Sequence, residues 1–254
     1  MSPDLARLFA TLLSLLGPAP ESDVNIPREL ILKPGDRIIA IGDSITQQGG
    51  YLKDVDAVLA EKYPDLKLPP IRNVGIGGQK AENLIKRFTK DVVDREPAVV
   101  LLSIGINDVW HRAGRPHDPQ ILADYWSNVS KMVEMAQAAG IKVILLTPTV
   151  IKEDASSKEN LRLRIYVEAE KQIARDRACT LVDLHAMFIS ALGKRPEDVP
   201  PGKNWLTGDG VHMAPTGDAL MALGVLRGLG VPTDKLSPTE PAEPKPAEPK
   251  PADR

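Results

Sequence analysis

Cysteine is nearly absent from the chain, because its 254 residues include only Cys179. A single thiol excludes an internal disulfide and is too little for a cysteine-based metal site. It lies in the apolar run ACTLVDL, which favours a buried thiol in a strand over a nucleophile. The four histidines show no compact metal-ligand spacing either. We therefore expect neither a bound metal nor another cofactor.

Net charge is also small, with 32 basic and 34 acidic residues and a formal charge of -2. Such a balance produces no broad field that would attract a polyanion or an anionic membrane. Nucleic acid is therefore not expected as a partner. Long apolar runs are missing as well, since the N-terminal stretch from Leu8 to Leu16 is far shorter than the about 20 residues that span a bilayer. No integral membrane segment is predicted.

The two ends of the chain differ in composition from its middle. Residues 1–22 fit either a signal peptide or an amphipathic N-terminal helix, because the apolar stretch is followed by Pro18 and Ala19 but Asp4 interrupts a basic start. Export to the periplasm or medium is the preferred interpretation, with a cytoplasmic enzyme as the alternative. Residues 237–254 form a Pro, Glu, Lys and Ala repeat that predicts a disordered tail. Residues 23–236 are then expected to form one domain, a size that buries a sizeable core.

Within that domain, short apolar runs alternate with longer segments of helical spacing. Continuous apolar runs rich in β-branched residues are typical of parallel strands covered on both faces. The helical segments have the length that crossover connections require. We therefore predict an α/β fold, a three-layer αβα sandwich around an open parallel sheet of about five strands. The expected strands lie in residues 36–44, 71–78, 98–108, 142–150 and 179–184, and the expected crossover helices in 80–95, 119–139 and 159–176.

Polar clusters follow the first three expected strands, in the order GDSIT, NVGIGGQ and GIND. In an open parallel sheet, ligands bind at the carboxyl ends of the strands. The three clusters should therefore face one crevice.

Acyl transfer needs a nucleophile, a base, a group that orients the base and donors for an oxyanion. Ser44 in GDSIT, at a strand-to-helix turn, is the candidate nucleophile, although a serine there is commonly a helix cap. Asp209 and His212, three residues apart before a helix expected to start at Pro215 or Thr216, are the candidate orienting acid and base. Alone, such a pair is usually formed by ordinary polar loop residues.

Three groups could stabilise the oxyanion. They are the backbone N–H of Ser44, the backbone N–H of Gly78 and the side-chain amide of Asn107. Simpler interpretations are a tight turn at the glycine and a turn cap at the asparagine. The combination with Asp209 and His212 favours the catalytic interpretation.

The four motifs together resemble the SGNH hydrolases, also called GDSL esterases and lipases. The blocks are GDSIT with Ser44, NVGIGG with Gly78, GIND with Asn107, and DGVH with Asp209 and His212, over roughly residues 36–229. The resemblance implies a flavodoxin-like fold and metal-free ester hydrolysis through an acyl-enzyme. It also implies a serine outside a strained elbow, in agreement with the lack of a GxSxG motif. Ile45 stands where the family name has leucine.

The substrate is less well determined by the sequence. The stretch VWHRAGRPHDP follows the third block, and its side chains could contact an alcohol or sugar or form a structural loop. No long apolar insertion suggests a lipid lid, so short acyl groups such as acetate on carbohydrates are favoured. A lysophospholipase or thioesterase, and a non-catalytic binding module, remain alternatives, and no oligomeric state is predicted. Candidate substrate contacts are Asp43, Trp110, His111, Trp205 and Met213, the last two of which could equally be core residues.

Overall fold

The computed structural model describes residues 1–16, 20–200 and 202–236, and its centre is a parallel sheet. The strand order is β2-β1-β3-β4-β5. This is the order of flavodoxin-like doubly wound folds, in which the first strand lies inside the sheet. The predicted α/β sandwich is confirmed. The strands are β1 (Ile38–Gly42), β2 (Arg72–Asn73), β3 (Val99–Ser103), β4 (Lys142–Leu146) and β5 (Thr180–Val182).

The register of the sheet brings the carboxyl ends of its strands together. Gly42 of β1 pairs with Ser103 of β3, and Ser103 pairs in turn with Leu146 of β4. Every residue of β1 and β3 is buried, as expected for strands covered on both faces. The expected strand in residues 71–78 is much shorter than predicted, because β2 has two exposed residues at the edge of the sheet and the chain then leaves it.

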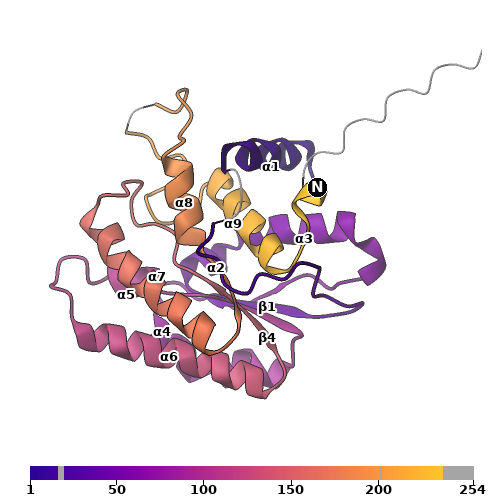
Figure 1. Cartoon of the computed structure of the whole chain (residues 1–254), viewed down its shortest axis with the longest axis horizontal. Coiled ribbons are helices and arrows are strands. Elements are labelled where there is room, and N and C mark those ends of the chain that lie inside the picture. The colour runs from indigo at the N-terminus through magenta and orange to yellow at the C-terminus, as the bar shows by residue number, and fades with distance from the viewer. Residues whose placement is uncertain (17–19, 201, 237–254) are drawn as a thin grey trace, which may run out of the picture.

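Helices cover both faces of the sheet, which lies between them in Figure 1. One layer contains α3 (Gly50–Lys62), α8 (Leu184–Leu192) and α9 (Pro215–Gly228), which contact one another through α9. The other contains α4 (Ala81–Asp91), α6 (Pro119–Ala138) and α7 (Lys158–Asp176), with α6 in contact with both neighbours. Short elements lie in the connections, namely α2 (Ser44–Gln48), α5 (Ile106–Trp110), η1 (Pro64–Leu66) and η2 (Val93–Arg95), and η3 (Thr233–Leu236) follows α9.

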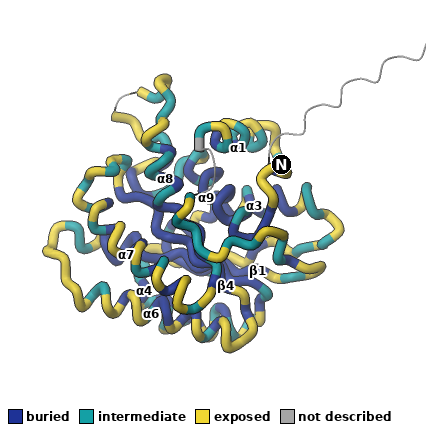
Figure 2. The backbone as a smooth tube through the Cα atoms, viewed as in Figure 1, coloured by how far each residue is buried: buried dark blue, intermediate teal, exposed yellow. Residues whose placement is uncertain are grey.

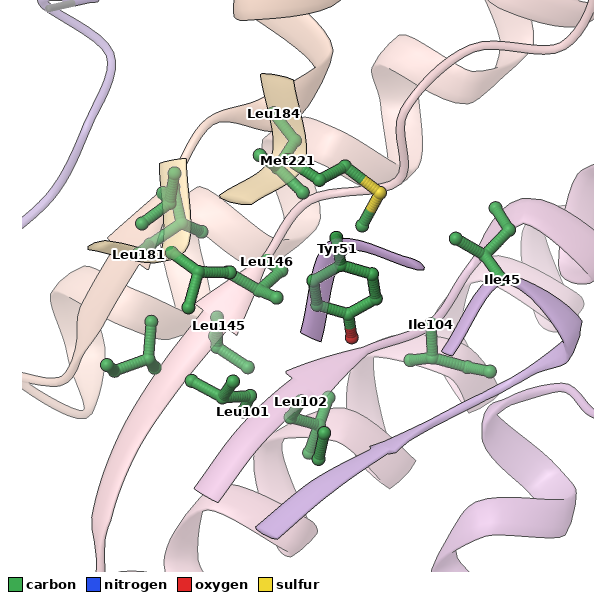
Figure 3. Packing of buried hydrophobic residues seen from close by; sticks show 14 of the residues in the cluster. Ile45, Tyr51, Leu101, Leu102, Ile104, Leu145, Leu146, Leu181, Leu184 and Met221 are labelled. Atoms are coloured by element: carbon green, nitrogen blue, oxygen red, sulfur yellow. The ribbon is translucent and has the colours of Figure 1, made fainter. Parts of the chain in front are cut away.

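The core fills the space between the sheet and the helix layers. Figure 2 shows the buried backbone concentrated in the strands and on the inner sides of the helices. Figure 3 shows Leu101 and Leu146, from neighbouring strands, in the same packed cluster as Tyr51 of α3 and Met221 of α9. All four of these side chains are fully buried. Burying apolar area contributes about 25 cal/mol for each Å² removed from water, so this packing stabilises the association of the helices with the sheet.

An N-terminal helix, α1 (Pro3–Leu16), lies outside the α8 and α9 layer. It contacts both helices, and its Phe9 and Leu12 are fully buried. In the described part of the chain, no helix is both long enough and apolar enough to cross a membrane. The predicted tail at 237–254 lies outside the described residues, and the domain limits at residues 22 and 236 stay predictions.

Candidate active site

Ser44 lies where β1 ends and α2 begins. We call residues 42–48, from the last residue of β1 to the end of α2, the serine turn. Ser44 is the first residue of α2, and Asp43 caps this helix by accepting the Ile45 N–H at 3.0 Å. A Cβ on Gly42 would lie 2.3 Å from the Thr46 Oγ1 and 2.5 Å from the Ser103 carbonyl oxygen. Only glycine fits there, because β1, α2 and β3 approach one another closely, and Ser44 is half-buried at the strand end.

The segment that carries Asp209 and His212 precedes α9, and we call residues 205–213 the histidine loop. One oxygen of the Asp209 carboxylate accepts the N–H groups of Val211 at 2.9 Å and His212 at 2.8 Å. Its other oxygen lies 2.6 Å from the Nδ1 of His212. The Nε2 of the same ring is 2.9 Å from the Oγ of Ser44. Residues 168 positions apart in the sequence are therefore joined in one hydrogen-bonded chain.

Two aspartates near these hydrogen bonds have pKa values shifted in opposite directions. Burial raises the pKa of Asp43 to about 6, although the Ile45 N–H and the charge of His212 act against it. Burial also tends to raise the pKa of Asp209, but hydrogen bonds from the side chain and backbone of His212 and from Val211 prevail and lower it to about 2. Asp209 is therefore ionised near neutral pH, which favours the Nδ1–H tautomer and leaves Nε2 able to accept the Ser44 proton.

The loop after β2 lies against the serine turn. The Ile76 N–H donates to the Gly42 carbonyl at 3.1 Å, and the Gly77 N–H donates to the Gln47 side chain at 2.9 Å. A Cβ on Gly77 would be 3.8 Å from the Cβ of Ser44. Gly78 follows with φ of +74°, a conformation that favours glycine. The loop thus brings the backbone of Gly78 beside the serine turn.

Asn107 reaches the same loop from the end of β3. It is 1% exposed, and its side-chain amide donates to the Gln79 carbonyl at 3.1 Å. One N–H of that amide remains for another acceptor. The N–H of Ser44 is also available, because the first N–H groups of a helix have no acceptor within it. The three candidate oxyanion donors therefore come from adjoining segments.

The five candidate substrate contacts separate into two groups. Trp110 is 37% exposed, and its ring centroid is 6.1 Å from that of His212. His111 is exposed, and its Cε1 would be 3.8 Å from a Cβ on Gly78. These two side chains therefore border the Ser44 and His212 pair.

The other three side chains have different surroundings. Asp43 is 3% exposed and caps α2, so its carboxylate is engaged in the fold instead of facing a substrate. Trp205 and Met213 are partly buried and pack against the hydrophobic core, in agreement with the alternative interpretation of these residues. The rim of the site is therefore provided by Trp110 and His111.

Two charged residues that support this arrangement were missed by the sequence reasoning. Arg87 of α4 donates to the Gln79 side chain at 2.7 Å, the Val74 carbonyl at 2.7 Å and the Gly42 carbonyl at 3.2 Å. Glu153, in the loop after β4, accepts hydrogen bonds from the histidine loop. Neither lies in a motif, and in sequence both are indistinguishable from ordinary surface charges.

Other chemistry receives little support from the side chains. Among the described residues, no group of three or more His, Cys, Asp and Glu is arranged to hold a metal ion. Cys179 is buried next to β5, and burial raises the pKa of its thiol to about 12. A thiol that stays protonated at neutral pH is a poor nucleophile.

Comparison with known proteins finds relatives along most of the chain. The chain is 28% identical over 214 residues to an acetylxylan esterase of Geobacillus stearothermophilus, covering 77% of this chain and 94% of that one. It is 26% identical to the uncharacterized lipoprotein YqeF of Bacillus subtilis, covering 75% of this chain and 88% of the relative.

Solved structures extend the comparison to the fold. A crystal structure of the acetylxylan esterase Axe2 of Geobacillus stearothermophilus superposes with a TM-score of 0.70 and 28% identity, covering 80% of this chain and 97% of the other. LAE5, an alpha/beta hydrolase from the metagenome of Lake Arreo, superposes with a TM-score of 0.68 and 25% identity, covering 79% and 97%. Residues 40–220 match the GDSL-like lipase/acylhydrolase family. The chain therefore belongs to the GDSL-like lipase/acylhydrolase family and is a carboxylic ester hydrolase.

Proposed function

We propose that this protein is a serine esterase for short-chain carboxylic esters, including acetyl groups on carbohydrates, and that Ser44 carries the acyl group. The observation that supports this most is the unbroken chain from Ser44 Oγ to His212 Nε2 at 2.9 Å and from His212 Nδ1 to Asp209 at 2.6 Å. A nucleophile hydrogen-bonded to a base that is itself oriented by a third group is the arrangement that acyl transfer requires.

In the proposed reaction, His212 takes the proton of the Ser44 hydroxyl as Oγ attacks the ester carbonyl. The oxygen of that carbonyl becomes an oxyanion, which accepts hydrogen bonds from the N–H groups of Ser44 and Gly78 and the amide of Asn107. His212 then gives the proton to the leaving alcohol as the C–O bond breaks. Water attacks the acyl-enzyme by the same route, releasing the acid and restoring Ser44. Asp209 stays ionised and stabilises the imidazolium in both halves.

Two observations favour acetylated carbohydrates as substrates. The relative Axe2 of Geobacillus stearothermophilus, 28% identical to this chain, is described both as an acetylxylan esterase and as an acetyl-xylooligosaccharide esterase. Catalytic mutants of the same enzyme replace a serine, an aspartate and a histidine, and its aspartate also precedes its histidine by three residues. This spacing supports the catalytic roles proposed for Ser44, Asp209 and His212. At the site rim, Trp110 presents an exposed ring beside His212, a surface on which a sugar ring could stack.

Hydrolysis of a p-nitrophenyl ester series from acetate to palmitate tests the proposal. We expect the highest kcat/KM on acetate, with acetate also released from acetylated xylooligosaccharides. Ser44→Ala should abolish both activities, whereas Ser127→Ala, a change at an exposed serine of α6, should leave them unchanged. A Ser44→Ala protein that retained the wild-type rate would disprove the acyl-enzyme, and a maximum on long-chain esters would favour a lipase instead.

A further inference from the structure

Glu153 lies in the connection between β4 and α7, yet its contacts are with the histidine loop. Its side chain is 4% exposed. One carboxylate oxygen accepts the Trp205 N–H at 2.8 Å. The other accepts the N–H groups of Leu206 and Thr207, each at 2.7 Å, and the Thr207 hydroxyl at 2.9 Å. Four donors from three consecutive residues thus converge on one buried carboxylate.

The contacts continue from this carboxylate to the catalytic pair. The Thr207 Oγ1 that donates to Glu153 also accepts the Gly210 N–H at 3.2 Å, and the Gly210 carbonyl accepts the Lys152 N–H at 2.6 Å. The Gly208 N–H donates to the His212 carbonyl at 2.8 Å. Two adjacent residues of the β4 to α7 connection therefore hold the histidine loop on both sides of Asp209.

Apart from these contacts, the histidine loop is supported by its own hydrogen bonds and by Leu206 and Val211, which are buried in the core. All of its residues are described, and they contain no helix or strand, with regular pairing limited to one bridge between Thr207 and Met213. Arg195 pairs with Glu153 at a distance of 3.6 Å. A buried carboxylate is costly unless hydrogen bonds compensate for its lost hydration, and hydrogen bonds to a charged acceptor are stronger than those between neutral groups. The carboxylate and the loop therefore depend on each other.

We propose that Glu153 is a positioning residue for ester hydrolysis, which holds the histidine loop so that His212 stays within hydrogen-bond distance of Ser44. This inference rests on the proposed function of Ser44 and His212. Rate depends steeply on such placement, because a displacement of about 1 Å can lower it about a hundredfold. Glu153 binds the backbone of the loop instead of the reacting groups, so its effect acts on kcat with little change in KM.

Three substitutions vary the contacts in steps. Glu153→Gln keeps an oxygen for Leu206 and Thr207 but turns an amide NH2 toward the Trp205 N–H, and we expect kcat to fall about tenfold. Glu153→Asp retains the charge at a shorter reach, and Glu153→Leu removes every acceptor, for which we expect a loss of about a hundredfold. Each variant is assayed with p-nitrophenyl acetate at a temperature well below its own Tm.

Asp183 provides the matched control. It is 1% exposed, accepts the Ala186 N–H at 2.9 Å and the Thr147 hydroxyl at 3.2 Å, and pairs with Lys171 at 2.8 Å. Asp183→Asn therefore disturbs an equally buried carboxylate that anchors α8 instead of the histidine loop. We expect it to lower Tm while kcat stays at the wild-type value.

A double-variant cycle with Asp209→Asn distinguishes positioning from general stabilisation. If Glu153 acts through the Asp209 and His212 pair, Glu153→Gln should lower kcat much less in the Asp209→Asn background than in the wild type. A lowered Tm with wild-type kcat, or equal losses of kcat in both backgrounds, would overturn the inference. Failure of the proposed function is seen separately, as activity that survives Ser44→Ala.

Discussion

The serine turn and the histidine loop meet at one hydrogen bond but are built by different means. The serine turn continues β1 directly into α2 and is capped by its own Asp43, and glycine at position 42 lets it pack closely against β3. The histidine loop contains no helix or strand, and besides its own hydrogen bonds and its buried Leu206 and Val211 it is held by Lys152 and Glu153, about 55 residues earlier in the chain. The proposed nucleophile thus lies where a strand runs directly into a helix, whereas the proposed base lies in an irregular loop that depends more on a distant segment.

The strongest test of this comparison asks whether the two regions act as one unit. Ser44→Ala and His212→Ala should each lower kcat by about 10⁴ to 10⁶-fold, because neither group works without the other. The double variant should be no slower than either single one. Steady-state hydrolysis of p-nitrophenyl acetate measures these rates, with circular dichroism as the control for folding. Losses that add on a logarithmic scale would show that the two residues act separately.

Glycine substitutions compare the backbone of the two regions. Gly42→Ala places a methyl group 2.3 Å from the Thr46 hydroxyl, so we expect a loss of about 1–3 kcal/mol in unfolding free energy and a fall in kcat. Gly210→Ala meets its nearest atom at 3.4 Å but keeps φ near +96°, a strain of about 1–2 kcal/mol. Urea unfolding and ester hydrolysis measure both effects.

Gly114→Ala is the control for that pair, because nothing lies within 4 Å of its Cβ position. It should change neither stability nor rate. A Gly42→Ala protein with wild-type stability and rate would show that the serine turn tolerates a side chain, and the proposed local framework would be wrong.

The pH dependence of stability should separate the two aspartates. Asp43 has its pKa raised to about 6 by burial, so the folded state binds its proton more tightly, and the unfolding free energy falls as the pH rises from about 4 to 6. Burial tends to raise the pKa of Asp209, but hydrogen bonds from His212 and Val211 outweigh burial and lower it to about 2. The stabilising contribution of Asp209 is therefore lost only as the pH falls below about 4. For a buried group such as Asp43, a tenfold change in proton affinity on folding corresponds to about 1.4 kcal/mol.

Asp43→Asn should therefore gain stability relative to the wild type between pH 4 and 6 while retaining the cap of α2. Asp209→Asn should show a pH-dependent difference only below pH 4. Urea unfolding of the wild type and both variants from pH 2.5 to 7 measures the differences. Parallel curves for Asp43→Asn and the wild type would contradict the raised pKa.

The smallest expected effect concerns the rim. Trp110→Ala should raise KM for an acetylated xylooligosaccharide severalfold with little change in kcat, because its ring borders the site without hydrogen bonding to Ser44. Trp126, 39% exposed on α6, provides the matched control, and Trp126→Ala should leave KM unchanged. Equal KM values for the two variants would remove Trp110 from the substrate site.

The fold was predictable where the sequence signal is local. Continuous apolar runs identified all five strands, and α6 begins at the predicted Pro119. The strand of residues 71–78 was predicted too long, because its apolar residues alternate with glycines that leave the sheet to form the loop beside Ser44. The helices α3 and α8 were not predicted.

The sequence by itself determined which groups we propose for catalysis. Ser44 after an apolar strand, and Asp209 three residues before His212, are recognisable because their spacing is local. Only the tertiary structure decided how these groups are held, since Glu153, Lys152 and Arg87 act through contacts with distant segments. A charge in a polar stretch has the same appearance in sequence whether it faces solvent or a buried backbone. The parallel sheet brings its strand ends together in space, and that convergence decides which charges support the site.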